Sequence, residues 1–171
     1  ALASGATGGI GMASAINFAN LGANVILMAR NEDKLKKTLA ILDTSKGQKH
    51  SYIITDLSSD GSLEKACTQI KSLKIDILLN NTGGPAGGPI IDANPIAFIN
   101  TFNQHLIANH KLVQAVLPNM KNQPYGRVIN VISTSVKAPL NGLGVSNTIR
   151  GAVANWAKTM ANELGQFNIT V

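Results

Sequence analysis

The sequence has little cysteine, few aromatic residues and no long apolar run, and each absence excludes a class of protein. A single cysteine, Cys67, cannot form an intrachain disulfide, so we expect a reducing, cytoplasmic environment. No apolar run approaches the ~20 residues that span a bilayer. No basic segment followed by an apolar one indicates a signal peptide. We therefore expect neither secretion nor a membrane partner.

The positive charge is the second feature to interpret. The net charge of +6 comes from lysines scattered among polar neighbours. No arginine cluster or interleaved aromatic residues accompany them, so we expect no nucleic-acid partner. A basic surface attracts an anionic cofactor or substrate instead. We predict no metal site.

The start of the chain carries the first motif. Ser4–Gly11 reads Ser-Gly-Ala-Thr-Gly-Gly-Ile-Gly, and it follows the apolar residues Ala1–Ala3. An amphipathic helical run comes next, with its apolar positions at Ile10, Ala13, Ile16, Ala19 and Leu21. This order predicts a strand, a glycine turn and a helix whose free N–H groups face the turn. Such a turn suits a phosphate, although it also occurs as a plain connection.

The rest of the chain alternates apolar strands with amphipathic helices. Strands are predicted over 23–29, 51–55, 75–79 and 127–132, with Asn31 and Asn94 capping helices. Two long helices are predicted over 95–121 and 145–165. The pattern indicates a single domain over residues 1–171, an α/β fold with a doubly wound parallel sheet between two helical layers (Rossmann-type, α/β/α). Its strands end at one edge, where ligands bind.

Both ends of the chain look cut. Only three residues precede the glycine turn, and residues 168–171 read as the beginning of another strand. We therefore expect a fold truncated at both ends. The segment that would close over a substrate is then absent, beyond Val171.

These motifs, in this order, resemble the short-chain dehydrogenase/reductase family over essentially the whole chain. Ser4–Gly11 matches the family's Thr-Gly-x-x-x-Gly-Ile-Gly with serine for threonine, and Asn80–Gly83 matches Asn-Asn-Ala-Gly. Asp56-Leu57, Leu117–Met120 and Gly126–Asn130 match three further family patterns. The resemblance implies contacts with a nicotinamide dinucleotide from Ser4, Gly5, Thr7, Gly9, Ile10, Gly11, Asp56, Leu57, Asn80, Asn81, Thr82, Gly83 and Arg150.

Arg30 favours NADP over NAD on separate physical grounds. A carboxylate at the end of the second strand would pair with the ribose hydroxyls of NAD and repel a 2′-phosphate. Arg30 stands there instead, and a guanidinium holds a phosphate through two donors. The Thr7 hydroxyl can add a contact to the same phosphate. An exposed arginine in a loop remains the alternative interpretation.

The chain departs from the family at its catalytic positions. The family has a serine after the fifth strand, a tyrosine and a lysine four residues apart, and an asparagine on the long helix. Ser133 matches the serine, but Ser146 stands for the tyrosine and Arg150 for the lysine. His105 stands at the asparagine position.

These replacements change the chemistry available. Ser146 is a far poorer acid than tyrosine, whereas Arg150 keeps a positive charge that can hold the nicotinamide ribose. His105 either takes over as the acid or is a helix residue with a satisfied ring nitrogen. Tyr52 and Tyr125 precede or begin strands, at the wrong edge of the sheet to replace the missing acid.

The nearest pattern is a divergent branch of the family that is similar to 3-oxoacyl-(acyl carrier protein) reductases and has an incomplete tetrad. Gly83–Pro85, Ser135–Pro139 and Ser146–Arg150 carry this resemblance. It implies an NADPH-dependent reductase of a carbonyl compound, either a 3-oxoacyl thioester, which can be carrier-bound, or a small ketone. The alternative is a catalytically silent NADP-binding sensor or partner subunit.

The resemblance also implies a homodimer or homotetramer. Family members associate through the helices that correspond to 95–121 and 145–165. Four candidates for that packing are Val113, Leu117, Trp156 and Met160. A monomer's core requires the same residue types.

Overall fold

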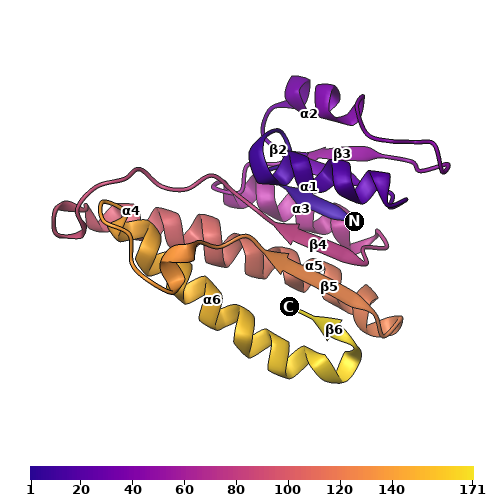
Figure 1. Cartoon of the computed structure of the whole chain (residues 1–171). Helices are drawn as coiled ribbons and strands as arrows, with labels where there is room; N and C mark the ends of the chain where they lie inside the picture. The colour runs from indigo at the N-terminus through magenta and orange to yellow at the C-terminus, as the bar shows by residue number, and fades with distance from the viewer.

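The computed structural model describes residues 1–171 and contains one sheet of six parallel strands (Figure 1). The strand order is β3-β2-β1-β4-β5-β6, so the chain winds outward in both directions from β1 and β4. This order confirms the doubly wound parallel fold. The strands are β1 Leu2–Ser4, β2 Ile26–Ala29, β3 Ser51–Ile54, β4 Ile77–Asn80, β5 Gly126–Asn130 and β6 Ile169–Thr170.

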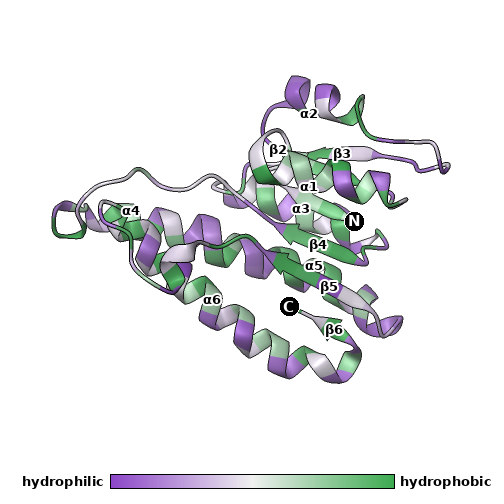
Figure 2. Ribbon diagram, viewed as in Figure 1, coloured by the Kyte–Doolittle hydropathy of each residue, from purple (hydrophilic) through white to green (hydrophobic).

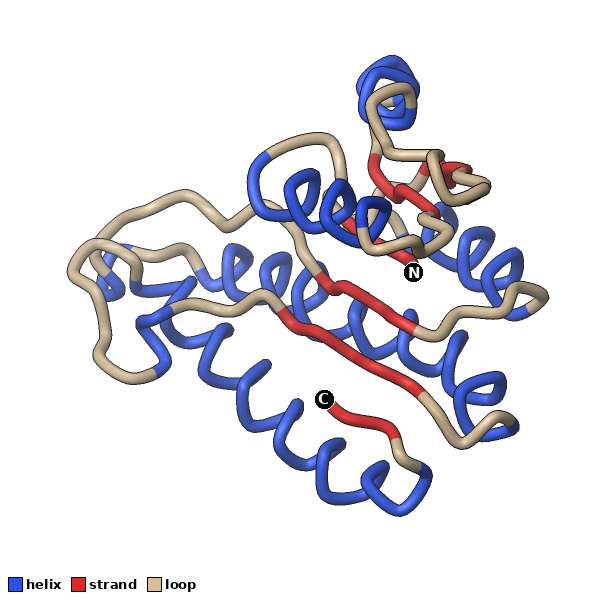
Figure 3. The backbone as a smooth tube through the Cα atoms, turned by 45° about the vertical axis from the view of Figure 1, so that its right-hand side comes forward, coloured by secondary structure: helices blue, strands red, loops and turns tan.

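Helices cover both faces of the sheet, as the tube in Figure 3 shows. Two of them pack on one face through the apolar cluster that contains Ala15, Leu27 and Leu35. Three others pack on the opposite face through the cluster that contains Leu63, Leu112 and Met160. The helices are α1 Gly9–Asn20, α2 Glu32–Leu39, α3 Asp60–Lys71, α4 Pro95–Phe102, α5 Ala108–Asn122 and α6 Gly144–Leu164.

The two apolar clusters are separated by the alternation of side chains along the strands. Leu78 belongs to one cluster and Leu79 to the other, because successive strand residues point to opposite faces. Both are at most 2% exposed. The central strands therefore read as short apolar runs, and β4 is mostly green in Figure 2.

Asparagine caps set two helix starts as the sequence predicts. The Asn31 side chain accepts a hydrogen bond from the Lys34 N–H at 2.8 Å. The Asn94 side chain accepts one from the Ile96 N–H at 3.0 Å, with Pro95 in the first turn. Each cap satisfies a backbone donor that a helix start leaves free.

Two expectations about helices were wrong in detail. The buried face of α1 is made by Gly11, Ala15 and Ala19, whereas Ile10 and Leu21 are 61% and 82% exposed. The predicted long helix 95–121 is interrupted by a π-helical segment, Asn103–Ile107, between α4 and α5. The π turn inserts an extra residue per turn, so the burial pattern shifts in phase at this point.

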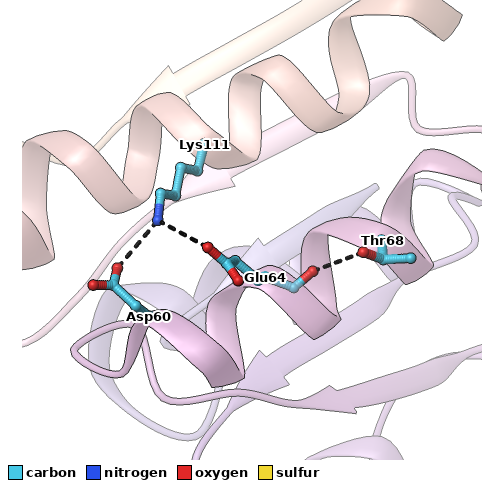
Figure 4. A network of polar contacts seen from close by, with 4 residues as sticks. All are labelled: Asp60, Glu64, Thr68 and Lys111. Carbon is cyan, nitrogen blue, oxygen red and sulfur yellow. Dashed lines mark hydrogen bonds and ion pairs between the residues drawn. The ribbon is translucent and has the colours of Figure 1, made fainter.

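A small polar network joins α3 to α5 on the outside of the domain (Figure 4). The Lys111 ammonium lies 3.1 Å from a carboxylate oxygen of Asp60 and 3.9 Å from one of Glu64. The Thr68 hydroxyl donates to the Glu64 carbonyl at 2.9 Å. Because both carboxylates are exposed, water and salt screen the network, and it adds little to stability.

Candidate active site

A cavity of about 650 Å³ opens where the central strands end. Its wall is built from the segments that follow β1, β2, β3 and β4, so four connections meet at one sheet edge. Of the predicted cofactor residues, those that line it are Gly5, Thr7, Gly9, Ile10, Arg30, Asp56, Leu57, Asn81, Thr82 and Gly83. Its volume lies within the range of small-molecule sites.

The glycine turn borders this cavity with bare backbone. Gly8 precedes α1 without a side-chain cap, and a Cβ built on Gly8 or Gly9 would meet no other atom within 4 Å. The space beside these glycines belongs to the cavity, which leaves the first N–H groups of α1 accessible from it. Their positive partial charge suits an anion.

Gly11 lies in the first turn of α1, directly after the glycine turn. It does not line the cavity, because it packs against the turn itself. A Cβ on Gly11 would lie 2.3 Å from the Gly5 carbonyl oxygen and 2.7 Å from the Asn81 side chain. Gly11 thus lets the helix approach the turn closely.

Ser4 and Asn80 also lie beneath the cavity and do not line it. The Ser4 hydroxyl accepts a hydrogen bond from the Asn81 N–H at 2.9 Å and donates to the Leu79 carbonyl at 3.1 Å. The Asn80 side chain donates to Asn130 at 2.9 Å. Both residues therefore join neighbouring strands at this edge of the sheet.

Positive charge gathers at the end of β2. Arg30 lines the cavity together with Lys34, which lies one turn into α2. Asp56 faces them from the end of β3. Hydrogen bonds from Ser58, and then the Arg30 charge, lower the pKa of the Asp56 carboxyl. That carboxylate accepts from the Ser58 N–H at 2.9 Å and from its hydroxyl at 2.6 Å.

Sequence reasoning missed several lining residues, of which Lys34, Gln104 and Thr55 matter most. The Gln104 side chain donates to the Thr82 hydroxyl at 2.9 Å and so joins the π segment to the loop after β4. The Thr55 hydroxyl is buried and has no partner. Of these three residues, only Lys34 could have been predicted from the sequence to line the cavity, because it lies one turn after Arg30 on a predicted helix.

Three of the four candidate catalytic residues lie on the π segment and α6, and the fourth, Ser133, directly precedes a 3-10 turn. The π segment, the 3-10 turn Thr134–Val136 and α6 are in mutual contact through α6. The Arg150 guanidinium donates to the Val131 carbonyl at 2.6 Å, and Ser133 accepts from the Ser135 N–H at 3.1 Å. No hydrogen bond joins Ser133, Ser146, Arg150 and His105 to one another.

Neither tyrosine reaches this region. The Tyr52 hydroxyl donates to Glu32 at 2.9 Å on the outside of the domain. The Tyr125 ring lies under the Arg127 guanidinium, 4.3 Å from it. Both tyrosines are thus engaged elsewhere, as the sequence predicts.

His105 is buried on the π segment. It is 0% exposed, and the Gly83 backbone is the hydrogen-bonding group that acts on its ring. Burial, and then the nearby Arg150 charge, lower the pKa of His105 to about 4, against a weaker opposing effect of the Gly83 backbone. The ring is therefore neutral near pH 7.

His105 should make the stability of the protein sensitive to acid. Its pKa is lowered in the folded chain from the ordinary 6.5 to about 4. The unfolded chain therefore binds a proton first as the pH falls, so stability is full above about pH 6.5 and declines toward pH 4. The expected loss is on the order of 2 to 3 kcal/mol. Chemical denaturation at pH 7 and pH 4.5 measures it.

The control for this prediction is the exposed His110 on α5. His105→Asn should flatten the decline between the two pH values, whereas His110→Asn should leave it unchanged. An equal effect of the two substitutions, or a decline that His105→Asn does not alter, would show that another group sets the acid sensitivity.

The comparisons with known proteins agree with this architecture. The family model for short chain dehydrogenase matches residues 1–171. Dehydrogenase/reductase SDR family member 6 of Xenopus laevis is 32% identical over 162 residues, which cover 94% of this chain and 62% of that protein. The (2S)-[(R)-hydroxy(phenyl)methyl]succinyl-CoA dehydrogenase subunit BbsD of Thauera aromatica is 28% identical over 177 residues, which cover 100% of this chain and 69% of that subunit.

Solved structures give the same result. YwfH, an NADPH dependent reductase involved in bacilysin biosynthesis, superposes with a TM-score of 0.92 at 25% identity. The match covers 99% of this chain and 68% of YwfH. The chain therefore belongs to the short-chain dehydrogenase family. It spans 62% and 63% of the lengths of the first two curated relatives it matches. None of its helices combines the length and apolarity needed to cross a membrane.

Proposed function

We propose that the protein is an NADP-dependent oxidoreductase that reduces a carbonyl compound, either a 3-oxoacyl thioester or a small ketone. The observation that carries the proposal is the cavity that joins the glycine turn to Arg30. Family membership and the NADPH dependence of YwfH support it. The coenzyme A thioester named for the Thauera aromatica relative supports the thioester as one substrate class.

The residues of the cavity fit a dinucleotide. The uncapped start of α1, with open space beside Gly8 and Gly9, suits the pyrophosphate. Arg30, Lys34 and the Thr7 hydroxyl suit a 2′-phosphate. The buried, unpartnered Thr55 hydroxyl is free to bind the ligand beside Asp56 and Leu57. When bound, NADPH supplies a hydride to the carbonyl carbon.

The protein's own residues then have to stabilise negative charge and deliver a proton. We assign the first part to Ser133, whose hydroxyl can donate to the oxygen that becomes an alkoxide. Arg150 is half-buried with no carboxylate partner, so its positive charge acts on the same region. Because His105 is neutral and Ser146 is a poor acid, we assign the proton to a water molecule.

Removing the Ser133 hydroxyl tests this assignment. Ser133→Ala should lower kcat for NADPH oxidation about 100-fold, because one donor to the developing oxyanion is lost. The assay would use a panel of small ketones and the N-acetylcysteamine thioester of 3-oxobutanoate. Thr134→Ala removes a hydroxyl from the neighbouring exposed residue and should leave kcat within twofold of the parent. Equal rates for Ser133→Ala and the parent would sink the role of Ser133.

The replacement of tyrosine and lysine by Ser146 and Arg150 favours a second candidate function. A protein that binds NADP without hydride transfer, as a sensor or partner subunit, needs the same cavity and no acid. Restoring the pair with Ser146→Tyr and Arg150→Lys separates the two functions. Activity gained from a silent parent would support the sensor, and full turnover by the parent would exclude it.

We further propose a homodimer or homotetramer through α4, α5 and α6. Two of the residues predicted for that contact, Val113 and Met160, belong to the core of the chain itself, at 3% and 8% exposure. Ile96 and Ile99 of α4 are instead 52% and 55% exposed. Light scattering on the full-length protein tests the assembly, and a monomeric mass at micromolar concentration would contradict it.

A further inference from the structure

A second cavity, of about 560 Å³, lies beyond the end of β5. It is formed between the loop after β4 and the segment that leads into α6, and it shares no lining residue with the cofactor cavity. No charged residue lines it. The residues that matter here are Pro89, Ile90, Ser135, Leu140 and Asn147. Its volume is that of a small-molecule site.

Two polar atoms in this lining are buried without a partner. Ser135 is 4% exposed, and its hydroxyl makes no hydrogen bond. The side-chain oxygen of Asn147 is also buried and unpartnered. A buried polar atom without a partner destabilises the fold unless something bonds to it. Two such atoms in one cavity can be satisfied by a bound molecule.

The Ser135 N–H and the Asn147 side-chain nitrogen already form hydrogen bonds, so the Ser135 hydroxyl and the Asn147 side-chain oxygen are the groups that remain for a ligand. The Ser135 N–H donates to Ser133 at 3.1 Å. The Asn147 side-chain nitrogen donates to the Leu140 carbonyl at 2.8 Å, so its oxygen is the free end of the amide. That oxygen can only accept a hydrogen bond, whereas the Ser135 hydroxyl can donate or accept.

The wall around these atoms is held in place by the backbone. The Gly88 N–H donates to the Gly142 carbonyl at 2.6 Å, and the Gly144 N–H donates to the Gly88 carbonyl at 3.3 Å. Gly144 packs so closely on Ile90 that a Cβ there would lie 2.5 Å from the Ile90 Cα. The loops after β4 and β5 are thus joined, and the cavity is preformed.

We propose that Ser135 and Asn147 bind a hydroxyl group of the substrate and so select hydroxyketones among carbonyl compounds. A hydroxyl has one hydrogen to donate to the Asn147 oxygen and lone pairs that can accept from Ser135, so it is complementary to both atoms. A carboxylate or phosphate would be buried in this uncharged lining without a counter-charge. The inference rests on the proposed reductase function for the reacting carbonyl, but the hydroxyl contact is a binding property.

The test compares 4-hydroxy-2-butanone with 2-butanone by ligand-observed NMR titration of the full-length protein, without cofactor and with NADP⁺. The oxidised cofactor has no hydride to donate, so the ketone is not reduced during the titration. The hydroxyketone should bind about tenfold more tightly than 2-butanone, because its hydroxyl forms hydrogen bonds with buried groups that 2-butanone cannot form. Ser135→Ala and Asn147→Ala should each reduce that preference to threefold or less. Thr134→Ala, which removes a hydroxyl from the same turn but not from the cavity, should retain it.

Equal dissociation constants for the two ketones in the unaltered protein would overturn the inference, whether or not the variants fold. A loss of preference in Thr134→Ala as large as in Ser135→Ala would also overturn it. NADPH oxidation is measured separately on both ketones. If the hydroxyketone bound more tightly but neither ketone supported NADPH oxidation, the reductase function would be contradicted and this inference would stand. If both ketones supported NADPH oxidation but bound equally, this inference would be contradicted and the reductase function would stand.

Discussion

Arg30→Asp should weaken NADPH binding about 100-fold while changing NADH binding less than threefold. The arginine lines the cavity at the end of β2, where it can hold a 2′-phosphate through two charge-assisted hydrogen bonds. Aspartate removes these donors and adds a negative charge that repels the phosphate. Calorimetric titration with both cofactors measures the two dissociation constants.

The matched control is Lys37→Asp, which makes the same change of charge on α2. Lys37 is exposed and does not line the cavity. Its replacement should weaken NADPH binding less than threefold, because solvent and salt screen a distant surface charge. If both variants lost NADPH affinity equally, the effect would come from net charge and not from a phosphate contact at Arg30.

Gly11→Ala should lower the free energy of unfolding by about 2 to 4 kcal/mol and abolish cofactor binding. The added methyl group would lie 2.3 Å from the Gly5 carbonyl oxygen and 2.8 Å from its carbon. These are backbone atoms, so relief requires α1 to move away from the turn. Urea denaturation followed by circular dichroism gives the change in stability.

Two other glycines give the controls for this substitution. Gly61→Ala lies in α3 with no atom within 4 Å of the new Cβ, so it should be neutral or stabilise the fold by up to about 1 kcal/mol. Gly8→Ala should leave stability within about 1 kcal/mol but weaken cofactor binding, because its Cβ enters the open space beside the turn. A Gly11→Ala protein as stable as the parent would contradict the close packing described for α1.

The sheet could be predicted from the sequence because each strand is specified by residues within its own short segment. Each strand is a short apolar run, and the connections that follow it carry glycine or polar residues. Asn31 and Asn94 act as caps in the structure for the reason that predicts them, a side-chain oxygen placed before a helical run. The cavity at the strand ends follows from topology, since parallel strands bring their carboxyl ends to one edge.

Features that depend on contacts between distant segments could not be predicted from the sequence. Gln104 reaches the cavity only because the π segment turns it toward Thr82. Periodicity assigned Ile10 and Ala19 to the buried face of α1, but only Ala19 is buried, together with Gly11 and Ala15, and Ile10 is exposed. The complete burial of the His105 ring could not be predicted either, because it depends on all the segments that pack around the ring.

We propose above all that the cavity at the strand ends is the binding site for NADP. Fluorescence titration of the full-length protein with NADPH and NADH tests it most directly, with Trp156 and the bound nicotinamide as signals. We expect saturable binding of NADPH, with a dissociation constant at least tenfold lower than that of NADH. Tighter binding of NADH, or no saturable binding of either cofactor, would contradict the account.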